Sequence, residues 1–405
     1  MIFRNALIFD DCFKKGGFRT GGGRIREIFT EAECPREGID LHGAYVLPGL
    51  LDIHTHGNSG WDFSDGSAEG LRTMARYYAV HGVTSFAPTM TTVPKEQLEL
   101  ALRRISSAGP APFPSAKIAG IRLEGPYLSS ARKGAQNEAF LRLPDIGEFL
   151  RLQSICGNTI RMVDVAPELD GAMDFISAMS AQPAPPAHPA PLAQPASLAN
   201  LAHPAPLAQP AFRCRISAAH TAADYETASK AFDTGITHVT HLYNGMTPFH
   251  QREPGLIGAA AERSDVTAEL ICDGLHCHPS AVRMAFRLFP DRICLISDSL
   301  RCCGMPDGKY ELGGQDVYLK EGAAYLSDGT LAGAASNLFE DLRNAVRFGI
   351  SLRDAVLAAT LTPARVIGLD SEIGSLEPGK SADFLICSPD LKLIEVYIDG
   401  RKVGV

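Results

Sequence analysis

The chain has 405 residues, 45% of them hydrophobic, which is enough for one large domain with a smaller companion. Its formal net charge of −8 argues against nucleic acid or an anionic membrane surface as the main partner. No stretch approaches the roughly 20 apolar residues that span a bilayer, and no basic and then apolar leader follows Met1.

The ten cysteines are scattered along the chain and form no CxxC pair. A disulfide framework is not expected in a chain of this size without a leader. We therefore expect free thiols and a cytoplasmic location.

The two ends of the chain differ in pattern from its middle. Residues 1–49 contain the short strand-like runs ALIF, RIREIF and GAYVLP, and the tail contains DFLIC and EVYIDGRKV with the turn signal Asp399-Gly400. Neither end is large enough to bury a core alone. We expect residues 1–49 and 372–405 to pair into a small β-sandwich domain beside a larger domain over residues 50–371.

In the middle one pattern repeats eight times: an apolar or β-branched run ends in a polar residue, and a helical stretch such as 68–80 usually follows. The runs end, in order, at His54 and His56, Thr89, Glu124, Glu168, His220, His241, Asp273 with His276, and Asp298. Strands that alternate with helices form parallel sheets. Eight such units predict an α/β fold, a TIM-like (β/α)8 barrel whose active site lies at the carboxyl ends of the strands.

One segment interrupts this pattern before the fifth strand. Residues 182–211 are rich in Ala and Pro, and AHPAPLAQPA occurs at both 187–196 and 202–211. Proline at this density excludes a helix and favours extended chain. We interpret the segment as a disordered insertion, and we do not expect its His188 and His203 to bind metal. A short hairpin-like stretch, residues 310–333, precedes the closing helices.

The polar residues at the strand ends have the chemistry of metal ligands. His54 and His56 lie on one face of a strand because side chains alternate with a period of two. Zinc and iron accept imidazole nitrogen and carboxylate oxygen. The pair is joined at other strand ends by Glu124, His220, His241 and Asp298. We predict a metal site there, and the alternative is a set of polar residues hydrogen-bonded at the rim.

A second HxH pattern, His276-Cys277-His278, is expected to lie in a loop because it follows Asp273-Gly274 and precedes a proline. We interpret His276 as a substrate contact and His278 as a solvated residue. The remaining histidines of the barrel and ends are interpreted as structural or exposed: His42, His81, His238 and His250.

The sequence around these residues resembles that of the amidohydrolase superfamily, for example in LPGLLDIHTHG and GSLEPGKSADFLI. THLYNGM, REPGL and LEGPYLS narrow the resemblance to the family of N-acetylglucosamine-6-phosphate deacetylases. It covers essentially the whole chain except the Ala/Pro-rich insertion. The resemblance implies hydrolysis of N-acetyl-D-glucosamine 6-phosphate to D-glucosamine 6-phosphate and acetate, in amino-sugar catabolism.

The resemblance also implies residue roles. Glu124, His220 and His241 would bind the metal that holds the attacking water. His54 and His56 would serve a second position, giving one or two zinc or iron ions per subunit. Asp298 would be the catalytic acid and base. The substrate would be contacted by Asn244, Gly245, His276, Leu331, Ala332 and Gly333, with Arg252 reaching the phosphate across a homodimer interface.

Gln136, in KGAQN, departs from the family, which often has His at this position to polarise the amide carbonyl. Glutamine donates a hydrogen bond but carries no positive charge. A metal would then do more of the polarising, and the HxH pair makes a second metal plausible. We state this coupling as a hypothesis.

Three alternatives remain open at this point. The first is an N-acetylgalactosamine-6-phosphate deacetylase. Its substrate differs in the direction of one hydroxyl, which leaves no clear mark on the sequence. A cyclic-amide hydrolase commonly bridges two metals through a carboxylated lysine, and Glu124 at the corresponding strand end disfavours it. A non-catalytic sugar-phosphate sensor has no need of an acid and base, so Asp298 argues against it.

Overall fold

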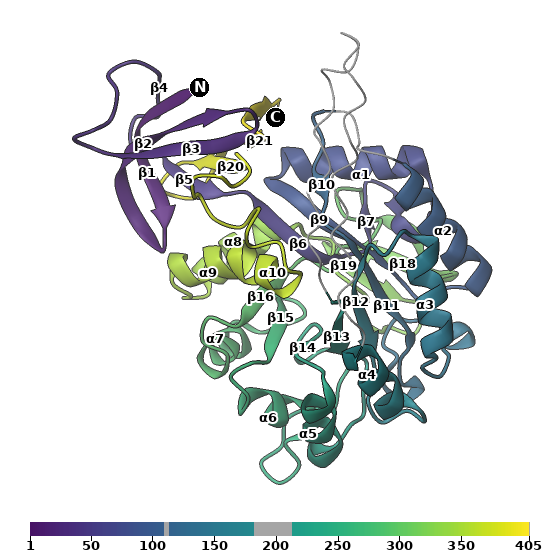
Figure 1. Cartoon of the computed structure of the whole chain (residues 1–405). Coiled ribbons are helices and arrows are strands. Elements are labelled where there is room, and N and C mark those ends of the chain that lie inside the picture. Colours follow the sequence, from purple (N-terminus) through teal and green to yellow (C-terminus); the bar gives the residue numbers. More distant parts are fainter. Residues whose placement is uncertain (109–112, 182–212, 405) are drawn as a thin grey trace.

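The computed structural model describes residues 1–108, 113–181 and 213–404, and its centre is a parallel β-barrel (Figure 1). The predicted insertion at 182–211, with His188 and His203, lies outside the described residues. Eight strands pair in parallel in chain order: β6 (Leu50–Thr55), β9 (Val83–Met90), β11 (Ile121–Tyr127), β12 (Ile160–Val165), β13 (Arg215–Ala218), β14 (His238–Val239), β15 (Thr267–Ile271) and β16 (Ile293–Ile296). The predicted (β/α)8 barrel is confirmed.

Helices follow the strands and cover the outside of the barrel (Figure 1). They are α1 (Ala68–Val80), α2 (Lys95–Ser107), α3 (Ile146–Ile155), α4 (Ala172–Ala181), α5 (Tyr225–Thr234), α6 (Gly255–Ala261), α7 (Pro279–Leu288) and α8 (Leu338–Arg347), followed by α9 (Leu352–Ala359) and α10 (Leu361–Val366). The first has the predicted bounds. Ser67 caps it by accepting a hydrogen bond from the Gly70 N–H, and its buried residues recur at helical spacing, at Leu71, Met74 and Tyr78. None of the described helices is long and apolar enough to cross a membrane.

The barrel closes between its first and last strands at the carboxyl end. The Asp298 N–H donates to the His54 carbonyl at 2.9 Å, and the His56 N–H donates to the Ser299 carbonyl at 2.9 Å. The hydroxyls of Thr55 and Ser299, 244 residues apart in the chain, lie 2.7 Å from each other. This seam therefore runs directly beneath the expected site.

Both ends of the chain form a second, eight-stranded sheet beside the barrel (Figure 1). Its order is β22-β21-β20-β5-β1-β2-β3, with β4 beside β1; the strands are β1 (Ile2–Asp10), β2 (Cys12–Gly21), β3 (Arg24–Thr30), β4 (Ile39–Asp40), β5 (Tyr45–Pro48), β20 (Phe384–Cys387), β21 (Leu393–Ile398) and β22 (Arg401–Val403). Phe384 stacks on Tyr397 at 4.5 Å, and Phe3 stacks on Phe18 at 4.8 Å. The predicted small β-sandwich of both termini is confirmed, and its boundaries at 49 and 372 stay predictions.

A buried ion-pair cluster joins this sheet to the barrel. Lys117 lies on the short strand β10 (Lys117–Ile118), which pairs with β9. Its Nζ is 2.7 Å from Asp383 Oδ2 and 2.8 Å from Asp399 Oδ1. Asp399 and Gly400 form the predicted turn, with φ of 49° and 69°, the conformation that short hairpins require. Asp399 of this turn thus also forms an ion pair with Lys117 of the barrel.

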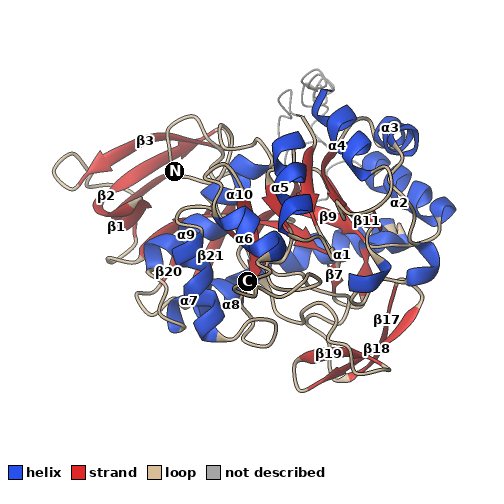
Figure 2. Ribbon diagram, turned by 90° about the horizontal axis from the view of Figure 1, so that it is seen from below, coloured by secondary structure: helices blue, strands red, loops and turns tan. Residues whose placement is uncertain are grey.

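An antiparallel hairpin unit separates β16 from α8. It has three strands, β17 (Gly308–Leu312), β18 (Gln315–Lys320) and β19 (Ala323–Leu326), and extends away from the terminal sheet in Figure 2. The predicted hairpin-like stretch is present, with one strand more than a hairpin needs. The chain then returns to the barrel, where the Ala334 N–H donates to the Asp298 carbonyl at 2.8 Å. Short elements complete the mouth: β7 (Gly57–Asn58), β8 (Trp61–Asp62), η1 (Phe63–Asp65), η2 (Ser130–Arg132) and η3 (Glu138–Phe140).

Candidate active site

Five predicted metal ligands meet at the carboxyl ends of the barrel strands. His54 lies in β6 and His56 directly follows it, Glu124 lies in β11, and His220 and His241 follow β13 and β14 by two residues. Each is at most 6% exposed. Parallel strands bring their carboxyl ends to one edge, so residues far apart in the sequence become neighbours here.

The carboxylate of Glu124 is the centre of the group. Its Oε1 is 2.9 Å from His241 Nε2 and 3.1 Å from His220 Nε2. Its Oε2 is 3.0 Å from His56 Nε2, and His54 Nε2 is 3.5 Å from Oε1. The ligand atoms form two sets within 4.8 Å, Glu124 with His220 and His241, and Glu124 with His54 and His56. The two predicted metal positions therefore adjoin and share Glu124.

The hydrogen-bond partners of the rings test whether these residues fit a cation. His220 Nδ1 faces the Arg132 carbonyl at 2.9 Å, so this nitrogen carries the hydrogen and Nε2 carries a lone pair. The Nε2 atoms of His220 and His241 lie only 3.1 Å apart beside a carboxylate oxygen. The His220 lone pair and the Glu124 oxygen thus face one buried point, where a positive charge is needed to balance them. The donor set of imidazole nitrogen and carboxylate oxygen fits a divalent cation.

The pKa of His56 also indicates a site that favours a cation. Burial lowers the pKa of His56, but its hydrogen bonds to Asp298 and Glu124 outweigh burial and raise that pKa to about 9. Metals and protons compete for the same lone pairs. A group of carboxylates that attracts protons this strongly onto neighbouring imidazoles attracts a metal cation for the same reason.

Asp298 lies beside the ligand set of Glu124, His54 and His56. Its Oδ1 is 3.3 Å from His56 Nε2 and 3.4 Å from His54 Nε2. Burial raises the pKa of Asp298, but the nearby charges of His54 and His56 outweigh burial and bring it below the usual value. The carboxylate is therefore ionised at neutral pH and able to accept a proton.

Three of these residues have strained backbone. His220, His241 and Asp298 have φ of 42°, 27° and 49°, values that non-glycine residues rarely adopt. Such strain costs on the order of 1–3 kcal/mol per residue and clusters at functional sites. Each strained residue comes just after a strand, at the rim where the ligand group lies.

A cavity of about 230 Å³ opens above the ligand group. Six of the predicted substrate contacts line it together with Gln136: Asn244, Gly245, His276, Leu331, Ala332 and Gly333. It is also lined by residues that the sequence did not single out: Gly134, Ala135, Leu300, Leu312 and Thr330. Thr330 directly precedes the predicted contacts at 331–333, and Gly134 and Ala135 directly precede Gln136, so their neighbours were a signal for them. Leu312 lies on the hairpin strand β17, apart in the sequence from the predicted contacts.

Gln136 contacts a metal ligand in this structure. Its Oε1 accepts hydrogen bonds from the Thr92 N–H at 2.9 Å and the Thr91 hydroxyl at 3.0 Å. Since a backbone N–H only donates, the amide orientation is fixed. Its Nε2 then donates to Glu124 Oε2 at 2.6 Å. Gln136 orients the Glu124 carboxylate, and its contact with a substrate carbonyl stays a prediction.

His276 is held rigidly in the cavity wall. Its Nδ1 is 2.7 Å from Asp273 Oδ2, and its Nε2 is 2.6 Å from the Ala332 carbonyl. Burial lowers the pKa of His276, but the hydrogen bond and charge of Asp273 raise it above the usual value. Both ring nitrogens face acceptors, so the protonated ring is favoured. His278 is exposed as predicted, and it also caps α7 through a hydrogen bond from the Ser280 N–H.

The predicted phosphate contact, Arg252, does not line this cavity. It is exposed in the loop between β14 and α6, where its N–H faces His250 Nδ1 at 3.4 Å. Of the histidines interpreted as structural or exposed, His42 and His250 are exposed and His81 is half-buried. His238 is buried and contacts Thr267 Oγ1 at 2.6 Å.

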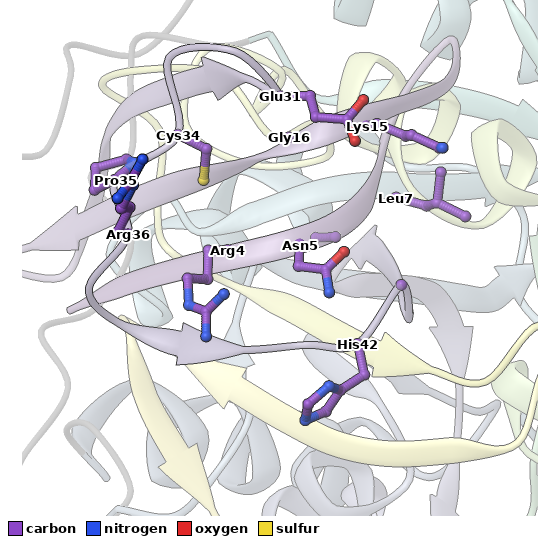
Figure 3. A pocket seen from close by; sticks show the side chains of 12 residues that line it. Arg4, Asn5, Leu7, Lys15, Gly16, Glu31, Cys34, Pro35, Arg36 and His42 are labelled. Atoms are coloured by element: carbon purple, nitrogen blue, oxygen red, sulfur yellow. The ribbon is translucent and has the colours of Figure 1, made fainter.

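A second cavity, of about 420 Å³, lies in the terminal sheet (Figure 3). It is lined by several charged residues, including Arg4, Lys15 and Arg36. Arg4 is paired with Asp40 at 2.8 Å, and Figure 3 shows Lys15 and Arg36 on opposite sides of the cavity. Its charges do not converge on one point, as those of the barrel site do.

Fold and site together define a barrel enzyme with a candidate metal centre at the carboxyl ends of its strands. The family model described as "Amidohydrolase family" matches residues 45–403. The chain belongs to the amidohydrolase family, whose members generally depend on divalent metals.

The similar proteins are sugar-phosphate deacetylases. N-acetylglucosamine-6-phosphate deacetylase of Vibrio furnissii is 33% identical over 91% of this chain and 85% of its own length. N-acetylgalactosamine-6-phosphate deacetylase of Escherichia coli O157:H7 is 33% identical over 88% of this chain and 87% of its own. A mutant N-acetyl-D-glucosamine-6-phosphate deacetylase of Mycobacterium smegmatis, solved with N-acetyl-D-glucosamine-6-phosphate, has a TM-score of 0.86 at 29% identity and covers 100% of this chain and 99% of that one.

Proposed function

We propose that this chain hydrolyses N-acetyl-D-glucosamine 6-phosphate to D-glucosamine 6-phosphate and acetate, in amino-sugar catabolism. One observation carries the proposal: four buried histidines share the carboxylate of Glu124, and all of this group except His54 lines a cavity together with the ionised Asp298. A deacetylase needs this arrangement, because an acetamide is a poor electrophile with a poor leaving group. The names of the similar proteins supply the substrate class.

The residues that would hold the metal are Glu124 with His220 and His241, and for a second ion Glu124 with His54 and His56. We propose zinc or iron, since both accept this set of nitrogen and oxygen donors. A divalent metal bound there supplies a Lewis acid for the acetyl carbonyl and lowers the pKa of water toward about 7. Gln136 keeps the Glu124 carboxylate turned toward both positions through its 2.6 Å hydrogen bond.

Asp298 performs the proton transfers. Its pKa is below the usual value, so it is ionised at neutral pH and accepts the proton of the attacking water. It then gives this proton to the departing amine. One carboxylate serves both steps because they follow each other, and the cavity brings the substrate to the same side of Asp298 as the ligand group.

The cavity wall binds the sugar. We propose contacts from Asn244, Gly245, the charged His276 and the 331–333 segment, all of which line the cavity. Arg252, which does not line it, would reach the phosphate from a second copy of the chain, with its planar fork matching the phosphate oxygens. The proposed assembly is therefore a homodimer in which each subunit completes the other's site.

The second candidate substrate is N-acetylgalactosamine 6-phosphate. The relative named N-acetylgalactosamine-6-phosphate deacetylase is 33% identical to this chain, and so is one named N-acetylglucosamine-6-phosphate deacetylase. The described cavity residues do not separate the two epimers, which differ in one hydroxyl direction.

The test is acetate release from both epimers and from unphosphorylated N-acetylglucosamine, with bound metal counted by elemental analysis on the same sample. We expect turnover to be fastest with the gluco phosphate and slow without the phosphate. About two metals per chain would assign His54 and His56 to a working position. No acetate from any of the three despite bound metal would overturn the proposal.

The proposed role of Arg252 has a complementation test. Arg252→Ala should raise KM for the phosphorylated sugar, while Gln251→Ala in the same exposed loop should not. Neither Arg252→Ala nor Asp298→Asn alone has a complete site. Mixed dimers of the two variants have one site with both residues if Arg252 acts in the partner, and we expect activity to return on mixing. No return with mixed dimers present would show that Arg252 does not act across an interface.

A cytoplasmic location is also proposed. All ten cysteines are free thiols, and eight of them are buried. Free thiols persist in a reducing compartment. Fractionation of the source cells with an activity assay would check this.

A further inference from the structure

We propose that Glu269 is a positioning residue that holds His54 in the orientation and tautomer needed to bind a metal, and that Arg122 keeps Glu269 in place. The inference rests on the proposed metal-dependent function and extends the site to strands β15 and β11. Both side chains are fully buried beneath the ligand group.

Four hydrogen-bond donors contact the carboxylate of Glu269. Its Oε2 lies 2.9 Å from His54 Nδ1 and 3.2 Å from the backbone N–H of His241. Its Oε1 lies 3.1 Å from His238 Nε2 and also pairs with Arg122 Nη1. Two of the four donors therefore belong to predicted metal ligands, and the other two hold the carboxylate from behind.

These contacts determine which nitrogen of His54 faces the site. An ionised carboxylate only accepts hydrogen bonds, so His54 Nδ1 must carry the hydrogen. In the neutral ring, the form that binds a metal, Nε2 then carries the lone pair. This Nε2 is buried without a hydrogen-bond partner, 3.4 Å from Asp298 Oδ1. Glu269 thus turns the free lone pair of His54 toward the ligand group. A hydrogen bond from a metal-binding imidazole to a carboxylate also increases the basicity of the imidazole.

His220 achieves the same orientation by a weaker means. Its Nδ1 donates to the Arg132 carbonyl at 2.9 Å, a neutral acceptor at the end of η2. Glu269 instead offers a full negative charge from a barrel strand. His54 therefore depends on a charged side chain where His220 depends on the backbone.

Arg122 explains why Glu269 stays ionised in a dry interior. Its Nη2 lies 3.0 and 3.1 Å from the Asp164 oxygens and 2.8 Å from Thr240 Oγ1, and its Nη1 pairs with Glu269. One guanidinium thus faces two carboxylates, and all three side chains are fully buried. The cluster has an excess negative charge below His54, which favours a cation above it.

A purely structural role is the alternative, since a buried ion-pair cluster also stabilises the barrel. The cluster provides a matched control, because Asp164 pairs with Arg122 as Glu269 does but contacts none of the predicted metal ligands in the described structure. Glu269→Gln turns an amide N–H toward at least one of the four donors and removes the charge. Asp164→Asn makes the same change on the other side of Arg122.

The experiment measures zinc affinity by competition with a chelator, zinc stoichiometry, and Tm for the full-length protein and both variants. We expect Glu269→Gln to lose about 10- to 100-fold in affinity for the ion held by His54 and His56. Asp164→Asn should lower Tm at least as much while its zinc affinity stays within about threefold of the wild type. Wild-type zinc affinity in Glu269→Gln, or an equal loss in both variants, would overturn the proposal.

A measurement on the unaltered sequence guards against a variant that fails to fold. Nitrogen-15 NMR of histidine-labelled, zinc-loaded protein reports the tautomer of each ring, with the His54 signal assigned by its loss in His54→Asn. We expect a hydrogen on Nδ1 and the metal on Nε2. A hydrogen on Nε2 of His54 would contradict the proposed orientation.

These readouts use zinc and no substrate, so they separate this inference from the proposed reaction. If the wild type releases no acetate but Glu269→Gln loses zinc, the positioning role is supported and the deacetylase is rejected. Acetate release with unchanged zinc affinity in Glu269→Gln would do the reverse.

Discussion

Gly245 lies against the imidazole of His220, so closely that a Cβ at position 245 would stand 2.8 Å from His220 Nδ1. Its φ of 59° also lies in the left-handed region. The glycine therefore does two things: it lets the chain turn after β14, and it leaves room for a metal ligand.

Gly245→Ala should displace His220 and break its hydrogen bond to the Arg132 carbonyl. We expect zinc affinity to fall by about tenfold or more, measured by chelator competition, with a parallel fall in kcat. Gly43→Ala is the matched control, because Gly43 has φ of 79° but nothing within 4 Å of an added Cβ. Wild-type zinc affinity in Gly245→Ala would show that the ring tolerates the methyl group.

Asp298→Asn should abolish proton transfer and retain the metal. Asparagine cannot accept the proton of the attacking water, so we expect kcat to fall by about 10²- to 10⁴-fold. Elemental analysis should give the same metal content as the wild type, since Asp298 belongs to neither ligand set. Substantial metal loss in this variant would make Asp298 a ligand and require another base.

Lys117→Met should destabilise the whole chain without altering the site. Removing the lysine leaves the buried Asp383 without its counter-charge beside the half-buried Asp399. We expect this to cost about 3–5 kcal/mol and to lower Tm. Asp383→Asn in the same chain should restore part of this loss. Lys14→Met, which breaks an exposed pair with Asp10, should leave Tm nearly unchanged. An unaltered Tm in Lys117→Met would show that the junction contributes little.

Asp341→Asn should stabilise the protein at high pH. Burial, together with the charge of Asp273, raises the pKa of Asp341 well above its usual value. The unfolded carboxyl has a pKa of about 3.9. Above that pH the unfolded chain releases a proton that the folded chain retains, so stability falls as pH rises toward the folded pKa. Asparagine removes this slope.

We therefore expect the Tm advantage of Asp341→Asn over the wild type to be larger at pH 8 than at pH 5. Asp224 is the opposite case: the Thr227 N–H lowers the pKa of this exposed helix cap, so its contribution is lost as pH falls. Asp224→Asn should give no gain at pH 8. A Tm advantage of Asp341→Asn that is independent of pH would contradict the assigned pKa direction.

The barrel and most of the site were predictable because their signals are local. Each ligand stands at the end of an apolar run, and the topology of parallel strands brings such ends together. The helix over 68–80 was predictable to the residue because Ser67 caps it and its apolar residues recur at helical spacing.

The buried cluster under the site was harder to predict. Arg122, Asp164 and Glu269 each interrupt an apolar strand, and alternation alone places such residues on the interior or the exterior of the barrel. Which of them meet depends on the stagger between strands, which no single run contains. The hydrogen bond from Gln136 to Glu124 depends on a loop conformation and had no sequence signal.

The seam between β6 and β16 has a consequence for folding. Its hydrogen bonds join Asp298 to His54 and Ser299 to His56, residues at the two extremes of the barrel sequence. Contacts of such long sequence separation form slowly, because most of the chain must already be ordered. An intermediate with an open seam would separate the proton-accepting carboxylate from two metal ligands, so it would have no turnover however much helix it contained. Recovery of activity during refolding should therefore report barrel closure itself, and it should follow the return of the circular dichroism signal.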